Sequence, residues 1–177
     1  MLVTLRGAKT VLTISSVVIK PFRTEYQESV EKLVLPIQQI EFGVKITREE
    51  QPDLMDIVGT FQTGDGNFWV AFDPIEKAVV GTIGVADIAN HQVALKKMFV
   101  AKSHRGKEKG VSKLLMNTAI EWCKSKGVKQ IYLGTTARMH AAHRFYEKNG
   151  FVEVMTAELP PLFPIVSVDT KFYCLTI

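Results

Sequence analysis

The chain has 177 residues, of which 46% are hydrophobic and 23% charged, with a formal net charge of +4 and two cysteines. A chain of this size can bury a core without disulfides or metals, so we expect one domain over residues 1–177. The charge is too modest to indicate a nucleic-acid or membrane partner. Cys123 and Cys174 form no disulfide framework, which indicates a reducing compartment and a cytoplasmic protein. No apolar run is long enough to cross a bilayer, and residues 11–19 lack the pattern of a signal peptide.

The N-terminal part of the chain predicts a strand followed by a helix. Residues 10–22 are rich in Val, Ile and Thr and end at Pro21, as a first strand should. Thr24 and Gln27 have capping-box spacing, and the apolar residues that follow recur at helical intervals. A helix should therefore begin near Thr24, and Pro36 should kink or end it.

The middle of the chain predicts an antiparallel sheet. Residues 40–60 are expected to be irregular, and a second capping box, Thr47 with Glu50, should open a short turn or helix before Pro52. Three segments of strand composition follow, separated by short turns, at 68–72, 78–88 and 92–100. They predict a three-stranded antiparallel meander.

The last third of the chain changes to helical periodicity. Apolar residues between 111 and 122 have the spacing of an amphipathic helix that ends at Gly127. A strand at 130–134, a helix ending at Asn149-Gly150, and strands at 151–156 and 169–177 complete the prediction. Because strands and helices alternate here, at least one strand pair should be parallel with a right-handed crossover.

Residues 105–111 join a predicted strand to the start of the strongest predicted helix. A helix start presents unpaired N–H groups and the positive end of the helix dipole, which favour an anion. Gly106 and Gly110 allow close approach of the backbone, and Lys107 and Lys109 add positive charge. The segment therefore suits a diphosphate, although the glycines could also serve only to shape a turn. It matches neither a Walker A loop nor a dinucleotide-binding fingerprint.

Two motifs resemble those of the GNAT acetyltransferase superfamily. Arg105 and Gly110 occupy the first and last positions of a segment similar to its acetyl-CoA-binding motif, although Glu108 replaces a usual glycine. Downstream, a helix that carries Phe145-Tyr146 and ends at Gly150-Phe151 is similar to the second signature. The resemblance spans about residues 96–154 and is that of a bacterial-type enzyme. It implies an α/β (α+β) GNAT fold, with a mixed, mostly antiparallel sheet of six to seven strands flanked by about four helices.

The resemblance also implies an activity and a site. It implies transfer of an acetyl group from acetyl-CoA to a primary amine by direct attack, with Tyr146 as general acid toward the leaving thiolate and no metal. The strand 94–100 would pair with the pantetheine arm and offer an N–H to the developing oxyanion. The residues expected to contact the cofactor are Met98, Phe99, Val100, Arg105, Gly106, Lys107, Glu108, Lys109, Gly110, Val111, Ser112 and Phe145.

The general base and the acceptor stay open. Relatives often carry a glutamate on the strand 94–100, but the candidate positions here hold Ala94, Lys96 and Lys97. Acting through water, the base could be Glu41, Asp87 or His91, each of which also suits an ordinary surface or turn position. The acceptor could be a small amine, an amino acid, a peptide N-terminus or an antibiotic, and the chain could be a monomer or a homodimer.

Some features of the sequence favour other interpretations. Glu108 and the missing strand glutamate favour, as an alternative, a catalytically silent acyl-CoA-binding or sensor module. His140 and His143 are expected to be helix-surface residues rather than metal ligands, and neither cysteine has a partner that would activate it. Phe68 and Trp69 could line the acceptor cleft, but the sheet core is the expected position. The basic residues 96–109 lack interleaved aromatics, so nucleic-acid binding is not expected.

Overall fold

The computed structural model describes residues 16–177. The expectations for residues 10–15 of the first strand, and for most of the segment 11–19, lie outside the described residues. The strands are β1 (Val18–Pro21), β2 (Asn67–Asp73), β3 (Ala78–Asp87), β4 (Gln92–Val100), β5 (Gln130–Thr135), β6 (Val152–Val154) and β7 (Lys171–Thr176). The helices are α1 (Gln27–Pro36), α2 (Pro52–Met55), α3 (Ile57–Phe61), α4 (Val111–Ser125) and α5 (His140–Lys148), with short helical turns η1 (Thr24–Tyr26), η2 (Ile37–Glu41), η3 (Lys102–His104) and η4 (Thr156–Glu158).

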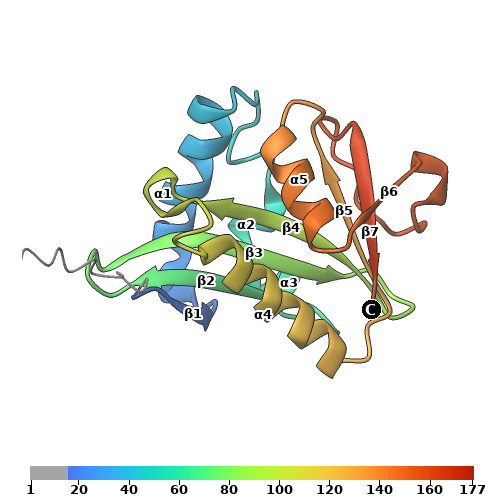
Figure 1. The fold of residues 1–177 in the computed structure, drawn as a ribbon, viewed down its shortest axis with the longest axis horizontal. Helices are drawn as coiled ribbons and strands as arrows, with labels where there is room; N and C mark the ends of the chain where they lie inside the picture. Colours follow the sequence, from blue (N-terminus) through green and yellow to red (C-terminus); the bar gives the residue numbers. More distant parts are fainter. Residues whose placement is uncertain (1–15) are drawn as a thin grey trace, which may run out of the picture.

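The seven strands form one mixed sheet in the order β1-β2-β3-β4-β5-β7-β6. Every neighbouring pair is antiparallel except β4 and β5, which confirms the predicted meander and the predicted parallel pair. The parallel pairing joins only Gln92–Ala94 to Gln130–Tyr132. Beyond Ala94 the two strands diverge (Figure 1), and β5 continues along β7 up to Thr135. The edge of β4 that faces β5 therefore has no partner strand beyond Ala94 in the described part of the chain.

Helices cover both faces of the sheet (Figure 1). The helices α4 and α5 lie on one face, where Leu115, Met116 and Tyr146 share a core with Ile83 and Leu133. The helices α1, α2 and α3 lie on the other face, and their apolar residues form a second core with Phe68 and Val70. Since successive side chains of a strand point to opposite faces, β2 contributes Phe68 to one core and Trp69 to the other. The expectation that both residues belong to the core is confirmed.

The region before β2 is more helical than the sequence predicts. The segment predicted as irregular, 40–60, contains the short helices α2 and α3. Asp56 initiates α3, because its Oδ1 accepts the N–H of Gly59 at 2.8 Å. Both helices are shorter than the window over which helical periodicity can be recognised, and Gly59 weakens the pattern further.

Of the two predicted capping boxes, only the second forms, and Pro36 ends the first helix as predicted. No side-chain capping bond forms at Thr24, so η1 begins without the predicted capping box, and α1 starts only at Gln27. Pro36 ends α1 as predicted, and the chain continues as the π-helix η2. The second box is present as a turn, since Thr47 N–H donates to Glu50 at 2.7 Å and Glu50 N–H donates to Thr47 Oγ1 at 3.2 Å.

Candidate active site

A cleft opens where β4 and β5 diverge. Its floor consists of β4 residues Leu95 to Phe99, residues Leu133 to Thr136 at the end of β5, and Tyr146 from α5. Its walls are mostly apolar and come from the connections α1–α2 and β6–β7, through Phe42, Val44, Ile46, Phe163, Pro164, Val166 and Val168. An unpaired strand edge with apolar walls suits an extended ligand that pairs with the backbone like an added strand.

A β-bulge shapes the floor of this cleft. Thr82 of β3 pairs with Phe99, but Gly84 pairs with Lys96, so β4 holds one extra residue between them. Lys97 adopts the left-handed conformation, with φ of 53°, and its carbonyl oxygen accepts the Thr82 hydroxyl at 2.7 Å. The bulge thus redirects the backbone of β4 at Lys97 and Met98, at the edge without a partner strand. Of the predicted cofactor contacts on this strand, Met98 and Phe99 line the cleft, whereas Val100 does not.

Tyr146 reaches the cleft from α5 and is only 8% exposed. Its ring packs against Phe151 at 5.8 Å and Tyr173 at 6.0 Å between centroids, which fixes the direction of the side chain. Burial raises the pKa of Tyr146 to about 12, and the negative charge of Asp169 adds to this effect. The phenol therefore stays protonated at neutral pH and can donate a hydrogen bond. Its neighbour Phe145 packs against the core and does not line the cleft.

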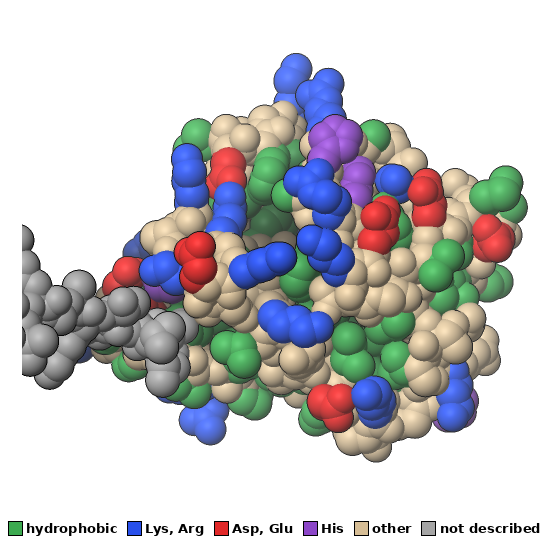
Figure 2. Space-filling model, viewed as in Figure 1, with side chains coloured by type: hydrophobic (Ala, Val, Ile, Leu, Met, Phe, Trp, Pro, Cys, Tyr) green, Lys and Arg blue, Asp and Glu red, His purple; other side chains and the backbone are tan. Residues whose placement is uncertain are grey.

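The N-terminus of α4 is open to an anion. Its N-cap Gly110 has φ of 67° and makes no side-chain capping bond, so the first N–H groups of α4 lack a side-chain partner. Gly106 has φ of 102°, and a Cβ there would meet nothing within 4 Å, so glycine is required for backbone conformation rather than for space. The segment 107–109 is exposed, Glu108 included. Figure 2 shows Lys and Arg side chains gathered around this end of α4 and over α5. These features fit a diphosphate.

Arg105, the first residue of the predicted motif, is held by other parts of the chain. Its Nε donates to the Val100 carbonyl at 2.7 Å, and its guanidinium forms a two-pronged ion pair with Glu41, in which Nη2 lies 2.9 Å from Oε2. The ion pair ties the loop before α4 to η2. The hydrogen bonds from Arg105 lower the pKa of Glu41, which outweighs the opposing effect of burial. Glu41 is therefore a weak proton acceptor.

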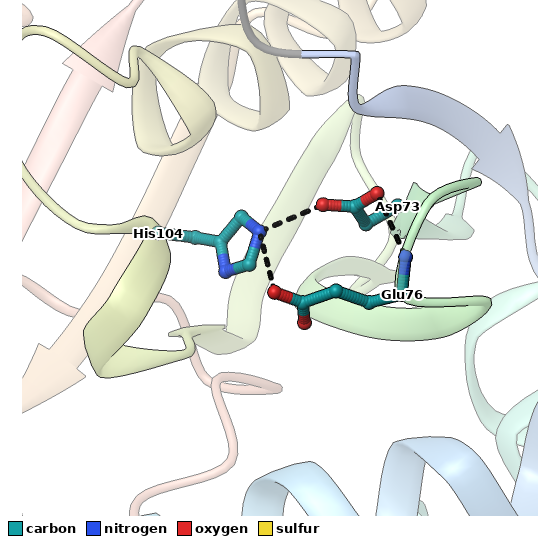
Figure 3. A group of neighbouring side chains, drawn as sticks. All are labelled: Asp73, Glu76 and His104. Atoms are coloured by element: carbon teal, nitrogen blue, oxygen red, sulfur yellow. Dashed lines mark hydrogen bonds and ion pairs between the residues drawn. The ribbon is translucent and has the colours of Figure 1, made fainter.

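A second set of side-chain contacts, between His104 and two carboxylates, holds the same loop. Figure 3 shows Asp73 at the end of β2, Glu76 in the turn to β3, and the ring of His104 pointing toward both carboxylates. His104 Nε2 lies 3.0 Å from Asp73 Oδ2 and 3.9 Å from Glu76 Oε1. The other oxygen of Asp73 accepts the N–H groups of Ile75 and Glu76. These residue types can bind metals, but none of the three lines the cleft. In this arrangement they join the β2–β3 hairpin to the residue before Arg105.

The Asp73–His104 contact predicts a pH effect on stability. The hydrogen bond from His104 lowers the pKa of Asp73, with smaller contributions from the two backbone N–H groups. A depressed carboxyl pKa adds stability above the unfolded-state value of about 3.9, and this stability is lost as pH falls through the folded-state pKa. We expect Asp73→Asn to melt at a lower temperature than the wild type at pH 7, and the gap to narrow toward pH 3. Thermal melts followed by circular dichroism check this, and a gap of constant size would contradict it.

The other two candidate bases, Asp87 and His91, lie at the turn that joins β3 to β4, away from the cleft. The carboxylate of Asp87 accepts the N–H groups of Asp65 at 2.9 Å and Ala89 at 2.7 Å, as a turn residue does. His91 lies in the tight turn before β4, with φ of 58°. Neither residue lines the cleft. The structure therefore places both residues in turns, which is the alternative expected for each from the sequence.

A set of buried charges that no sequence motif reveals lies beside the cleft. Asp53 of α2 lies 2.6 Å from the ammonium of Lys96 and 3.2 Å from that of Lys97. Lys97 also donates to Gln51 at 2.8 Å. Burial alone would raise the pKa of Asp53, but the two lysines outweigh it and lower that pKa. Asp169, which precedes β7, also lines the cleft. No spacing in the sequence could link these residues, because they come from three distant segments.

The histidines and cysteines have structural positions. His143 is buried rather than at the helix surface as expected, and its Nε2 lies 2.8 Å from the Thr136 carbonyl, which ties α5 to the end of β5. His140 is exposed, as predicted, and its ring contacts that of His143. Burial raises the pKa of Cys123 to about 12 and also raises that of Cys174. Both thiols are therefore poor nucleophiles at neutral pH.

Comparison with known proteins gives consistent matches. The model of the acetyltransferase (GNAT) family matches residues 32–151. The crystal structure of a GNAT-family acetyltransferase from Staphylococcus aureus is 38% identical, with a TM-score of 0.86, over 90% of this chain and 98% of that one. An acetyltransferase from Streptococcus agalactiae is 25% identical, with a TM-score of 0.86, over 93% of this chain and 100% of that one.

A curated vertebrate protein also matches part of the chain. The N-acetylaspartate synthetase of Xenopus tropicalis is 35% identical over 108 residues, which are 60% of this chain and 38% of that protein. The chain spans about half the length of the curated relatives it matches. Within residues 16–177, none of the helices combines the length and the hydropathy that a membrane span requires.

Proposed function

Because the chain belongs to the acetyltransferase (GNAT) family, we propose that it transfers an acetyl group from acetyl-CoA to a primary amine by direct attack. One observation carries the proposal: the cleft between the diverging β4 and β5 holds a buried, protonated Tyr146. The uncapped N-terminus of α4 adds a diphosphate site, reached along the same strand. The free thiols of Cys123 and Cys174 support a reducing compartment such as the cytoplasm.

In this proposal each part of the site has one task. The free edge of β4 pairs with the pantetheine arm, and an N–H near Phe99 or Val100 is available to the oxyanion. The first turn of α4, from Val111 to Ser112, together with Lys107, Lys109 and the loop glycines, holds the diphosphate. Arg105 keeps this loop in place through Glu41 and Val100. None of these tasks requires a metal.

Tyr146 assists the leaving thiolate in the proposed reaction. The pKa of Tyr146 is about 12, whereas that of a free thiol is about 8.5. Complete proton transfer from the phenol to the thiolate is therefore uphill. A hydrogen bond to the sulfur is not, because it strengthens as negative charge develops there. We therefore assign Tyr146 the role of a hydrogen-bond donor to the thiolate, with the proton on CoA-SH supplied finally from solvent.

A thiol-release assay tests the proposed function. The protein would be incubated with acetyl-CoA and a panel of alkylamines, polyamines, amino acids, short peptides and aminoglycosides, with free thiol and acetylated product both measured. We expect thiol release that depends on one class of amine and yields a product heavier by one acetyl group. Tight CoA binding in calorimetry without release on any amine would instead select the silent sensor module.

A further inference from the structure

Asp169 lies on the floor of the cleft, against the end of β5. A Cβ on Gly134 would come within 2.5 Å of Asp169 Oδ2, so the carboxylate occupies the space that the missing side chain leaves. The backbone N–H of Asp169 donates to the Val166 carbonyl at 2.9 Å and closes a turn. This turn fixes the position of Asp169 just before β7. Gly134 and Asp169 both line the cleft. The Asp169 carboxylate therefore lies where the amine substrate would bind in the cleft.

Asp169 and Tyr146 approach the gap between β4 and β5 from opposite faces of the sheet. Tyr146 belongs to the core on the α4–α5 side, together with Ile131 and Leu133 of β5. Tyr132 belongs to a separate cluster on the other face. Because side chains alternate along a strand, the missing side chain of Gly134 would point to the face of Tyr132, and Asp169 covers that position. Tyr146 can donate a hydrogen bond from one face, and Asp169 can accept a proton on the other. This arrangement matches a reaction in which a thiolate leaves on one side and an amine enters on the other.

Asp169 has no ion-pair partner among the residues that the structure describes. The charged groups nearest to it across the cleft are Lys96 and Lys97 of β4, and Asp53 of α2 already pairs with both. From α5 the group that faces it is the neutral phenol of Tyr146. The Val166 N–H donates to Asp169 Oδ2 at 3.4 Å. Burial raises the pKa of Asp169, and this hydrogen bond and the two lysines offset the effect only in part. Among the described residues no hydrogen bond reaches its other oxygen, Oδ1, which can therefore accept a proton from a ligand.

We propose that Asp169 is the proton acceptor for the incoming amine, an inference that rests on the proposed acetyl transfer. The carboxylate binds the substrate ammonium and takes one proton from it, leaving a neutral amine. The nitrogen lone pair then forms the C–N bond with the thioester carbonyl carbon, and the C–S bond breaks with its electron pair on sulfur. A second N–H proton passes to solvent as the amide forms, and solvent protonates the thiolate to CoA-SH. The sum is ammonium plus acetyl-CoA giving amide, CoA-SH and one proton, which Asp169 returns to solvent.

Two matched probe amines separate this role from a structural one. Benzylamine is an ammonium ion at pH 7, whereas aniline carries the same ring and is already neutral. In Asp169→Asn we expect kcat/KM for benzylamine at pH 7 to fall about 100-fold, the size typical of a lost general base. Acetylation of aniline should be nearly unchanged. The rate with benzylamine in this variant should rise about tenfold per pH unit up to the pKa of the amine, because only the free amine then reacts.

Controls make each outcome decisive. Asp87→Asn removes a carboxylate outside the cleft and should leave both probes unaffected. Calorimetry of CoA binding reports whether Asp169→Asn is folded, and carbon NMR should find a carboxyl resonance, absent from this variant, that titrates above the usual Asp range. If Asp169→Asn does not fold, Gly134→Ala displaces the same carboxylate and should show the same selective loss. If kcat/KM fell equally for both probes, or for neither, the proposed role of Asp169 would be wrong, while the proposed acetyl transfer would still stand. If the wild type acetylates neither probe nor any amine of the panel, the proposed function itself fails.

Discussion

Replacing Tyr146 by Phe should lower kcat by about 100-fold, the range expected when one group that stabilises a transition state is removed. The phenol is buried in the cleft and stays protonated, and the variant would lose the hydrogen bond that we propose it donates to the leaving thiolate. KM for acetyl-CoA should hardly change, because the bond forms only as charge develops on sulfur. Thiol release measured over a range of acetyl-CoA concentrations gives both constants.

Tyr173→Phe is the matched control for this prediction. Tyr173 belongs to the same aromatic cluster, but its hydroxyl donates to Glu147 at 3.0 Å, and it does not line the cleft. Loss of its hydroxyl should leave kcat close to that of the wild type. The aromatic packing survives in both variants, so a general loosening of the cluster would affect both alike. A Tyr146→Phe enzyme that keeps more than half of the wild-type kcat would remove Tyr146 from the mechanism.

Local patterns were enough to predict most of the fold. The meander β2–β4, the helix α4 and the helix α5 each carry their own periodicity and end signals, such as Gly127 with φ of 73° and Gly150 with φ of 89°. The short helix α3 depends instead on one capping bond from Asp56. Its five residues contain too little periodicity to be recognised in a sequence.

The candidate site could be predicted only where its residues are neighbours in the chain. The loop 105–111 and Tyr146 each belong to a contiguous motif, so the sequence alone makes them candidates. Asp169 becomes part of the cleft because it fits against Gly134 on another strand. Arg105 is oriented by Glu41, which the pattern around Arg105 does not reveal. Such contacts arise from packing of distant segments, so no spacing rule can supply them.

Asp53→Asn should lower the free energy of unfolding by about 3 kcal/mol, because removing one member of a buried ion pair leaves the other charge uncompensated. Asp53 is 9% exposed, and the side chain of Lys97 that it contacts is equally buried. Burial already lowers the pKa of Lys97, and Asp53 restores only part of the difference. Without Asp53, Lys97 must stay charged without a carboxylate or lose its proton. Urea unfolding at pH 7 measures the loss.

Two further variants and a pH series distinguish this explanation from a simple packing defect. Glu28→Gln breaks an exposed ion pair with Lys32 and should leave stability unchanged, since such pairs contribute little. The double variant Asp53→Asn with Lys97→Met should recover much of the lost stability, because it also removes the Lys97 charge that the single variant leaves unpaired. The deficit of Asp53→Asn should also shrink toward about pH 10, because burial lowers the pKa of Lys97 and lets it lose its proton before an exposed lysine does. If the deficit were the same at both pH values and the double variant were no more stable, the loss would have to come from packing rather than from the unpaired charge.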